Sequence, residues 1–225
     1  MDNELLKAIE ARHSVRRYTD RPIESDTVAA LNRVIDKCNR EGQLRIQLVL
    51  EDERTFGSFL VHYGAFSGVR NYFAIVGGGE RLHERAGYYG EQLVLEAQRL
   101  GLNTCWVALT FSKRRAHDRI NFGQGERLVC VISVGYGVDP GHGHKIKSFE
   151  QVTHVSEPVP QWFRNGVEAA LLAPTAINQQ QFRFELVGER QVRAVAKLGF
   201  YSKIDLGIVK LHFELGAGRE NFTWG

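Results

Sequence analysis

The sequence predicts an α+β fold in which a mixed or antiparallel sheet is flanked by helices. Several long segments repeat apolar residues at helical spacing, and shorter runs alternate apolar and polar residues as strands do. Helices and strands do not follow one another in a regular repeat, which favours α+β over a doubly wound sheet. With 225 residues, 43% of them hydrophobic, the chain is long enough to form a single domain over residues 1–225.

The first part of the chain has the clearest helical pattern. Val28, Leu31 and Ile35 share one face of a helix that we expect Ser25 to cap and Gly42 to end. The other elements expected here, in chain order, are a helix over 3–12, strands over 44–48 and 72–76, a helix over 82–100, a strand over 104–109, a short helix capped by Ser112 and a strand over 128–134. A glycine-rich loop over 135–143 follows them.

The second part begins near Glu157. We expect a helix through Trp162 and Val167 that Pro174 breaks, a strand over 182–186, and two helices over 191–197 and 205–215. Helix followed by strand occurs both in residues 25–50 and in residues 160–187, which suggests a duplication with half-units 1–156 and 157–225.

Composition and charge exclude several classes of protein. The net charge is only +3, and 29 basic residues are interleaved with 26 acidic ones, so we expect no nucleic-acid binding. No apolar run is long enough to span a membrane, and the N-terminus lacks a signal peptide. Cys38, Cys105 and Cys130 form no CxxC pair and suit buried thiols in a reducing compartment, so a cytoplasmic location is expected. We predict no metal site, because His142 and His144 have no third ligand nearby in the sequence.

Residues 12–16, Arg-His-Ser-Val-Arg, place two guanidinium groups and a hydroxyl at the end of the first helix. Arginine donates bidentate, charge-assisted hydrogen bonds that suit a phosphate group. Taken alone, the same residues also suit a solvated surface turn.

Residues 173–182 lie between a predicted helix and a predicted strand. Thr175 and Asn178 can bond a polyol or the heteroatoms of a ring, and Pro174, Ala176 and Ile177 can pack against a flat apolar ligand. A turn that satisfies its own backbone is the alternative.

Four segments together resemble the FMN-dependent nitroreductase family. They are Arg-x-Ser-x-Arg at 12–16, Gly-Leu-x-Thr-Cys-Trp at 101–106, Gly-Tyr-x-x-x-Pro at 135–140, and Ala-Pro-Thr-Ala-x-Asn-x-Gln at 173–180. The last is similar to the family's Ala-Pro-Ser-Ala-x-Asn-x-Gln box. Most members place that box before the strand that follows the second helix, where this chain has residues 41–44, so the chain looks like a branch with the box in its C-terminal half. Gln181 also stands where the common motif has Pro. The resemblance implies a nitroreductase-like fold.

The resemblance also implies FMN as the cofactor. Arg12 and Ser14 would hold its phosphate with help from Lys145 and Lys147, while His13 would supply backbone and packing.

Arg16 would face the pyrimidine edge of the ring, where a cation stabilises the negative charge that gathers near N1 and O2 on reduction. The backbone of Val107, Ala108 and Leu109 would approach N5 and O4. No side chain is expected to act as a catalytic acid or base, because the chemistry takes place at flavin N5.

The C-terminal box would contact the flavin ring or the ribityl chain. Its contributors would be Pro174, Thr175, Ala176, Asn178 and Gln180.

By resemblance, the protein is a homodimeric oxidoreductase that uses NAD(P)H to reduce a nitroaromatic, a quinone or a similar small acceptor by a ping-pong mechanism. Its flavin pocket is shared between subunits or, if the duplication is real, completed within one chain. Two alternatives stay open: a flavin-binding protein without nicotinamide turnover, and a flavoenzyme of another type, such as reductive dehalogenation or flavin fragmentation. Tyr63, Phe66, Tyr88 and Tyr89 either line the open face of the flavin or pack in the core.

Overall fold

The computed structural model describes residues 3–57, 66–156 and 158–225. The chain forms two compact units. The sheet unit comprises the described residues of 12–82 and 92–143, and the C-terminal unit comprises those of 1–11, 83–91 and 144–225. The predicted boundary at Glu157 lies outside the described residues. The division into half-units 1–156 and 157–225 stays a prediction.

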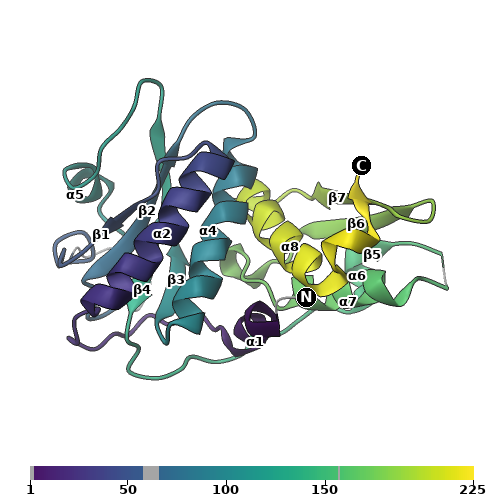
Figure 1. Cartoon of the computed structure of the whole chain (residues 1–225), viewed down its shortest axis with the longest axis horizontal. Helices are drawn as coiled ribbons and strands as arrows, with labels where there is room; N and C mark the ends of the chain where they lie inside the picture. Colours follow the sequence, from purple (N-terminus) through teal and green to yellow (C-terminus); the bar gives the residue numbers. More distant parts are fainter. Residues whose placement is uncertain (1–2, 58–65, 157) are drawn as a thin grey trace. The chain divides into compact units, whose positions relative to one another are not determined.

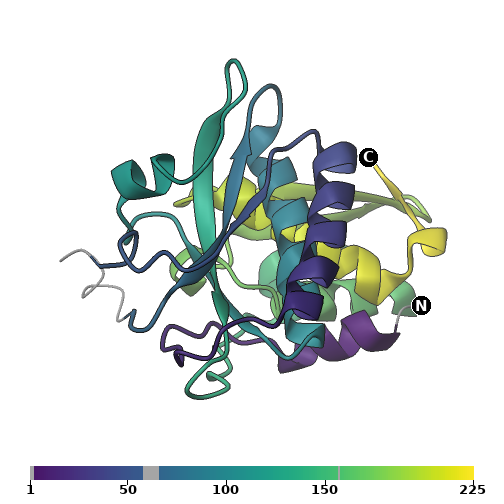
Figure 2. The ribbon, with the colours of Figure 1, turned by 60° about the vertical axis from the view of Figure 1, so that its left-hand side comes forward.

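The sheet unit is built on a four-stranded antiparallel sheet in the order β1-β2-β4-β3. The strands are β1 (Gln47–Val49), β2 (Asn71–Gly77), β3 (Asn103–Val107) and β4 (Arg127–Gly135). Helix α2 (Ser25–Gly42) and the C-terminal half of α4 (Leu82–Arg99) cover one face, and α5 (Lys113–His117) lies on the other side (Figures 1 and 2). Because both faces are covered, every residue of β2 is buried.

Three predictions for this unit were inexact. Helix α2 starts at Ser25, but its N-cap is Glu24, with no side-chain cap, so Ser25 is the first helical residue and does not cap the helix. The strand expected over 44–48 is confined to Gln47–Val49, because Leu44 makes only an isolated bridge to Gly77. The strand expected over 104–109 ends at Val107, where its pairing with β4 stops.

The C-terminal unit combines helices with a mixed sheet in the order β5-β6-β7-β8 (Figure 1). Its strands are β5 (Thr153–His154), β6 (Phe182–Val187), β7 (Gln191–Ala196) and β8 (Thr223–Trp224). Its helices are α1 (Asn3–Ala11), α6 (Phe149–Val152), α7 (Gln161–Leu171), α8 (Ser202–Ala217), and the 3-10 turns η1 (Ala176–Asn178) and η2 (Arg219–Asn221). An aromatic core joins them, with the ring of Phe213 4.7 Å from that of Phe184 and 5.6 Å from that of Phe163. The predicted α+β class is confirmed.

The helix expected over 191–197 was wrong, because this segment is strand β7. A three-residue turn after β6 begins with Gly188 at φ +70°, and it folds the chain back into an antiparallel hairpin that pairs Val187 with Gln191. Val192 points into the core and is fully buried. The period-2 pattern was too short to distinguish from a helical one.

Within the C-terminal unit, residues 83–91 of α4 pack closely on α8. A Cβ at Gly87 would lie 2.0 Å from the carbonyl oxygen of Ile204, and one at Gly207 would lie 2.0 Å from that of Glu84. Glycine at both positions therefore lets the two backbones approach. Further along, the ring nitrogen Nε2 of His212 lies 2.9 Å from a carboxylate oxygen of Glu91, both side chains being fully buried.

Within the described residues, no helix is long and apolar enough to cross a membrane. The three cysteines are free and buried, as predicted. Among the same residues, no three His, Cys, Asp or Glu side chains gather as a metal site would need.

Candidate functional site

The predicted N-terminal phosphate motif lies beside β3 in the sheet unit. The N–H of Val15 donates to the carbonyl of Thr104 at 3.0 Å, and Ser14 bridges to Thr104 in a parallel sense. This short pairing extends the sheet edge and fixes the backbone on which the donors are placed. Arg12 is only 4% exposed, whereas Arg16 is exposed.

Three predicted residues act on one thiol, that of Cys105 on β3. Burial raises the pKa of Cys105, and the charge of Arg16, a hydrogen bond from Ser14 and the charge of Arg12 act in the opposite direction. The structure therefore brings Arg12, Ser14 and Arg16 together. Two guanidinium groups and a hydroxyl near the same thiol are donors of the kind that suits an anion.

Tyr18 stabilises the turn of residues 12–16, a role that the sequence did not predict. Its buried hydroxyl donates to the carbonyl of Val15 at 2.7 Å and lies 2.8 Å from Oγ of Ser133 on β4. Burial raises the pKa of Tyr18 well above its usual value, so the hydroxyl stays protonated. The nearest signal in the sequence was a tyrosine two residues after the basic motif.

The glycine-rich loop packs against the same motif. Gly141 has φ +79°, and a Cβ there would lie 2.8 Å from Cβ of His13. Both the conformation and the space therefore require glycine. At the far end of β3, Val107 is buried, Ala108 is partly buried and Leu109 is 63% exposed, so the predicted buried strand leaves the core here.

The C-terminal box follows α7 in the C-terminal unit and has an uncommon backbone. Pro174 and Thr175 are partly buried, and η1 then turns the chain through Ala176. Ile177, Asn178 and Gln180 have φ values of 48°, 55° and 47°. The left-handed region is sparsely populated by residues other than glycine, and a β-branched residue there is an outlier. Such strained turns cluster at functional sites, where surrounding contacts hold them.

Amide hydrogen bonds hold the inner side of this turn. The side chain of Gln180, 3% exposed, donates to the carbonyl of Lys145 at 2.8 Å and to Oδ1 of Asn178 at 2.9 Å. Asn178 also donates to the carbonyl of Lys145 at 2.9 Å, and Oγ1 of Thr175 accepts from the N–H of Gln180. The structure thus brings the predicted box residues together with residues 145–147.

Lys145 and Lys147 differ in their surroundings. The ammonium of Lys147 donates to the carbonyls of Gln179 and Gln180 at 2.9 and 3.0 Å, so two of its three N–H groups stabilise the turn. Partial burial and the charge of Lys197 lower the pKa of Lys147. The Lys145 side chain is exposed.

A buried carboxylate, Asp205 of α8, holds the other side of the turn. Its oxygens accept from the N–H of Ala176 at 3.1 and 3.2 Å and from the side-chain amide of Gln179 at 2.9 Å. Burial raises the pKa of Asp205 to about 6. Sequence reasoning placed Asp205 at a helix start but had no signal for this contact across the unit.

The four aromatic residues considered for the open face of the flavin have different surroundings. Phe66 packs on Phe56 in the sheet unit, with ring centroids 5.6 Å apart. Tyr88 donates to Glu214 at 2.5 Å, and its ring meets that of Tyr89 edge to face. Tyr63 lies outside the described residues.

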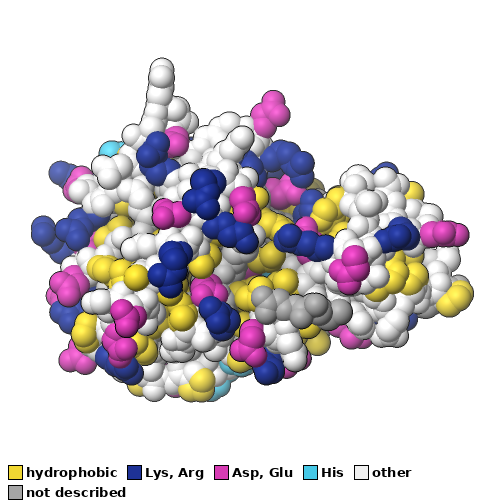
Figure 3. Space-filling view, viewed as in Figure 1, with side chains coloured by type: hydrophobic (Ala, Val, Ile, Leu, Met, Phe, Trp, Pro, Cys, Tyr) yellow, Lys and Arg dark blue, Asp and Glu magenta, His cyan; other side chains and the backbone are white. Residues whose placement is uncertain are grey.

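The two donor sets fit the parts of FMN. Guanidinium and hydroxyl donors in the sheet unit match a phosphate group, and the amide and hydroxyl groups of the box match a polyol or the edge of a heterocycle. Over α2 and α4, basic and acidic side chains are interspersed (Figure 3), which is unlike the clustered basic face of a nucleic-acid binder.

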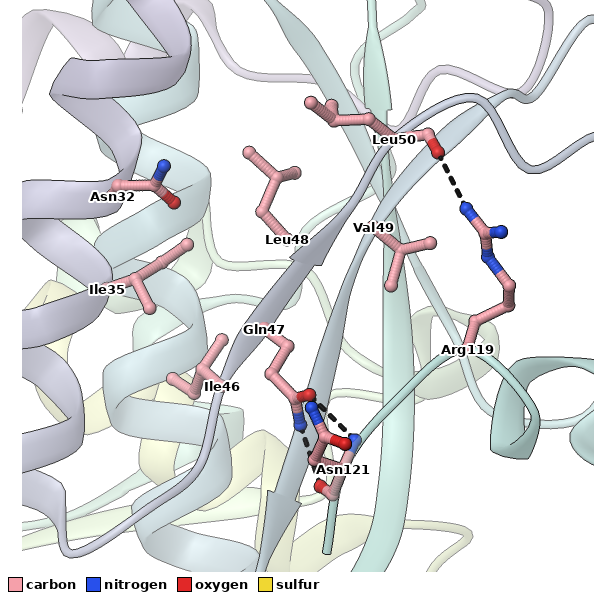
Figure 4. Close-up of a pocket in the computed structure, with 9 residues that line it drawn as sticks. All are labelled: Asn32, Ile35, Ile46, Gln47, Leu48, Val49, Leu50, Arg119 and Asn121. Carbon is pink, nitrogen blue, oxygen red and sulfur yellow. Dashed lines mark hydrogen bonds between the residues drawn. The ribbon is translucent and has the colours of Figure 1, made fainter.

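A separate cavity of about 580 Å³ follows the outer edge of β1 in the sheet unit (Figure 4). Its nine lining residues include none of the predicted FMN contacts. Side chains occupy the backbone groups of this edge: Asn39 bonds both the N–H and the carbonyl of Ile46, and Arg119 donates to the carbonyl of Leu50. Gln47 exchanges two hydrogen bonds with the backbone of Asn121.

Comparison with known proteins gives a consistent result. The family described as “Putative TM nitroreductase” matches residues 4–217. No curated protein sequence is significantly similar to the chain. Among solved structures, a protein from Thermotoga maritima described as a “putative nitroreductase” is similar, with 22% identity, a TM-score of 0.68, and coverage of 96% of this chain and 84% of that one. A protein from Desulfovibrio desulfuricans described as a “putative nitroreductase in complex with FMN” has 20% identity and a TM-score of 0.55, with coverage of 71% of this chain and 100% of that one. These likenesses establish the fold.

Proposed function

This chain belongs to the TM nitroreductase family, whose model matches residues 4–217, and on that premise we propose that it is an FMN-dependent oxidoreductase. The proposed reaction passes electrons from NAD(P)H to a nitroaromatic, a quinone or a similar small acceptor. The observation that carries the proposal is the gathering of Arg12, Ser14 and Arg16 beside β3. The similar structure from Desulfovibrio desulfuricans, which is a complex with FMN, supports the choice of ligand.

The N-terminal set binds the charged parts of the cofactor. Arg12 and Ser14 donate to the phosphate, with Lys145 and Lys147 adding positive charge, and His13 packs against the glycine-rich loop. A guanidinium that is 4% exposed bonds an anion more strongly than one in water, because the local dielectric is lower.

Arg16 would stabilise the negative charge of the reduced cofactor, and the backbone of Val107, Ala108 and Leu109 would help to hold the ring. When bound, FMN supplies hydride transfer at N5 in two separate half-reactions, which is the basis of a ping-pong cycle. The protein's part is to bind and orient, so no side chain serves as a catalytic acid or base.

The C-terminal box contacts the ring or the ribityl chain. The contributors are Pro174, Thr175, Ala176, Asn178 and Gln180. The support for this role is the held left-handed turn, which leaves Asn178 exposed at its tip while Gln180 is buried beneath it.

We also propose a homodimer in the cytoplasm. Three buried free thiols suit a reducing compartment. The dimer rests on the family resemblance.

A visible absorption spectrum tests the proposal. The purified protein is expected to show an oxidised-flavin band that bleaches on anaerobic addition of NADH or NADPH and returns with a quinone acceptor. A band that persists with both nucleotides would indicate flavin binding without nicotinamide turnover. No band, even after FMN is supplied, would reject the cofactor.

The Arg12→Ala variant tests the phosphate contact. Loss of a charge-assisted bond, worth about 1.5–3 kcal/mol, is expected to weaken FMN binding about ten- to a hundred-fold. Arg17→Ala is the matched control, because Arg17 belongs to the same segment but is 63% exposed and pairs with Asp139. Equal FMN affinity in both variants would remove Arg12 from the site.

Subunit arrangement is tested by mixing two variants that are each expected to bind FMN weakly, at an FMN concentration that fills only intact sites. An equal mixture of Arg12→Ala and Asn178→Ala chains that exchange subunits at random restores about a quarter of the sites if a dimer shares its pockets. No rescue, with a solution mass of 25.5 kDa, would replace the dimer by a single chain that completes its own pocket.

A further inference from the structure

The turn that carries Asn178 is held from below by one carboxylate. Asp205 lies in the first turn of α8 and is 3% exposed. It accepts from the N–H of Ala176, which starts the turn, and from the side chain of Gln179 within it. The same amide of Gln179 also donates to the carbonyl of Phe200. Asp205 therefore anchors both the box and, through Gln179, the loop before α8.

The backbone of the anchored turn has an energetically unfavourable conformation. Ile177, Asn178 and Gln180 all lie in the left-handed region, which persists for such residues only where surrounding contacts over-determine it. In this turn Ile177 is 83% exposed to solvent, and Phe200 in the neighbouring loop is 70% exposed. Apolar side chains presented in this way, next to an exposed amide, suit contact with a flat heterocyclic ligand.

We propose that Asp205 is a positioning residue of the cofactor site, whose carboxylate holds the 175–180 turn in the conformation that presents Asn178 and Ile177 to the ligand. The identity of that ligand as FMN rests on the proposed function. The holding role rests on the hydrogen bonds alone and can be measured without the cofactor.

The hydrogen bonds favour a carboxylate at this position. Two donors, a backbone N–H and a side-chain amide, converge on Asp205, and an ionised carboxylate is acceptor-only. An asparagine with its carbonyl oxygen in the place of Oδ2 would accept from both donors, but its NH₂ group would then face the N–H of Ala176. Burial opposes the ionised form and raises the pKa of Asp205 to about 6. At neutral pH the carboxyl group is therefore ionised although its buried surroundings disfavour the charge.

Amide hydrogen exchange on the protein with and without FMN tests the proposal. In Asp205→Asn and Asp205→Ala, exchange in residues 175–181 is expected to accelerate at least about ten-fold, while the amides of β6 keep their protection and show that the chain is folded. The FMN dissociation constant is expected to rise about ten-fold, as loss of one good hydrogen bond implies. Lys203→Ala is the matched control, because Lys203 is exposed in the same helical turn.

The outcomes separate this inference from the proposed function. Unchanged exchange in residues 175–181 in both Asp205 variants, with FMN still bound by the wild type, would overturn the positioning role alone. Faster exchange with unaltered FMN affinity would show that the turn is held but does not serve the cofactor, which also overturns it. A wild type that binds no FMN would reject the proposed function, and the cofactor role of Asp205 with it.

Discussion

Two buried aspartates, one in each unit, illustrate opposite uses of the same side chain. Asp52 in the sheet unit is 5% exposed and Asp205 is 3% exposed. Each lies beside residues with left-handed backbone: Glu51 at φ 53° next to Asp52, and Ile177 at φ 48° above Asp205. Yet the pKa of Asp52 is lowered and that of Asp205 is raised to about 6.

The deeper burial of Asp205 and the larger number of donors to Asp52 account for the difference. Burial acts to raise the pKa of both carboxyls. Asp52 overcomes it with four hydrogen bonds: from the N–H groups of Arg54 and Thr55 at 3.0 and 3.2 Å, and from the hydroxyls of Thr55 and Tyr72 at 2.6 and 2.9 Å. Among the described residues, the donors to Asp205 are Ala176 and Gln179. At neutral pH Asp52 therefore stabilises its unit, whereas the ionised Asp205 costs stability and is retained for the turn that it holds.

The largest expected effect tests the stabilising member of the pair. Asp52→Ala leaves the buried hydroxyls of Thr55 and Tyr72 and two N–H groups without their acceptor, and is expected to lower the free energy of unfolding by about 3–5 kcal/mol. Denaturant unfolding followed by circular dichroism measures it. Asp52→Asn keeps one acceptor oxygen and should lose less. A loss below about 1 kcal/mol would mean that the network contributes little.

The opposite result is expected at Asp205. Its pKa rises from 3.8 to about 6, so ionisation costs about 3 kcal/mol of folding free energy at pH 8, since each pKa unit is worth about 1.4 kcal/mol. Asp205→Asn removes the cost of ionisation and should raise the free energy of unfolding by up to about 3 kcal/mol. The gain is reduced by the contact between the new NH₂ group and the N–H of Ala176. If Asp205→Asn lowered the free energy of unfolding as much as Asp52→Ala does, the two aspartates would not have opposite effects on stability.

The two residues should also give opposite pH dependence. A raised folded pKa means that the contribution of Asp205 is fully present below its unfolded pKa of 3.8 and is lost as the pH rises through about 6. A lowered folded pKa means that the contribution of Asp52 is present above 3.8 and is lost as the pH falls through its folded value. The stability of wild type relative to Asp205→Asn should fall between pH 4 and pH 7, by up to about 1.4 kcal/mol per pH unit. A flat difference would contradict the raised pKa.

The smallest expected effect concerns the strained backbone itself. Ile177→Gly relieves a left-handed β-branched residue but increases the entropy of the unfolded chain, so a net gain of about 0.5–1 kcal/mol is expected from thermal unfolding. Glu51→Gly is the matched change beside Asp52. A loss of stability in Ile177→Gly would show that this exposed side chain packs against something that stabilises the fold.

The regular elements were predictable because their patterns are local. Leu31 and Ile35 on α2, and the buried run of β2, follow directly from spacing. Strand β7 was misread because its burial depends on the hairpin with β6, and the two-residue strands β5 and β8 exist only through pairing with distant residues. Local sequence cannot show such pairing.

The candidate site shows the same division. Its donor types at 12–16 and 173–180 could be recognised, because the chemistry resides in the residue types. The residues that support these donors could not be recognised from the sequence. Tyr18 bonds the carbonyl of Val15 through a turn, and Asp205 accepts from the N–H of Ala176 although it lies on a separate helix. The left-handed run at Ile177 and Asn178 was also hidden, since no glycine marks it.

The outer edge of β1 has a consequence for the protein at high concentration. An unguarded edge strand offers a template on which a second molecule can add its own strand and begin an aggregate. Here Asn39 and Arg119 already occupy backbone groups of Ile46 and Leu50. A neighbouring chain would have to displace these bonds before it could pair, so side chains of the same unit discourage fibril-like growth along this edge.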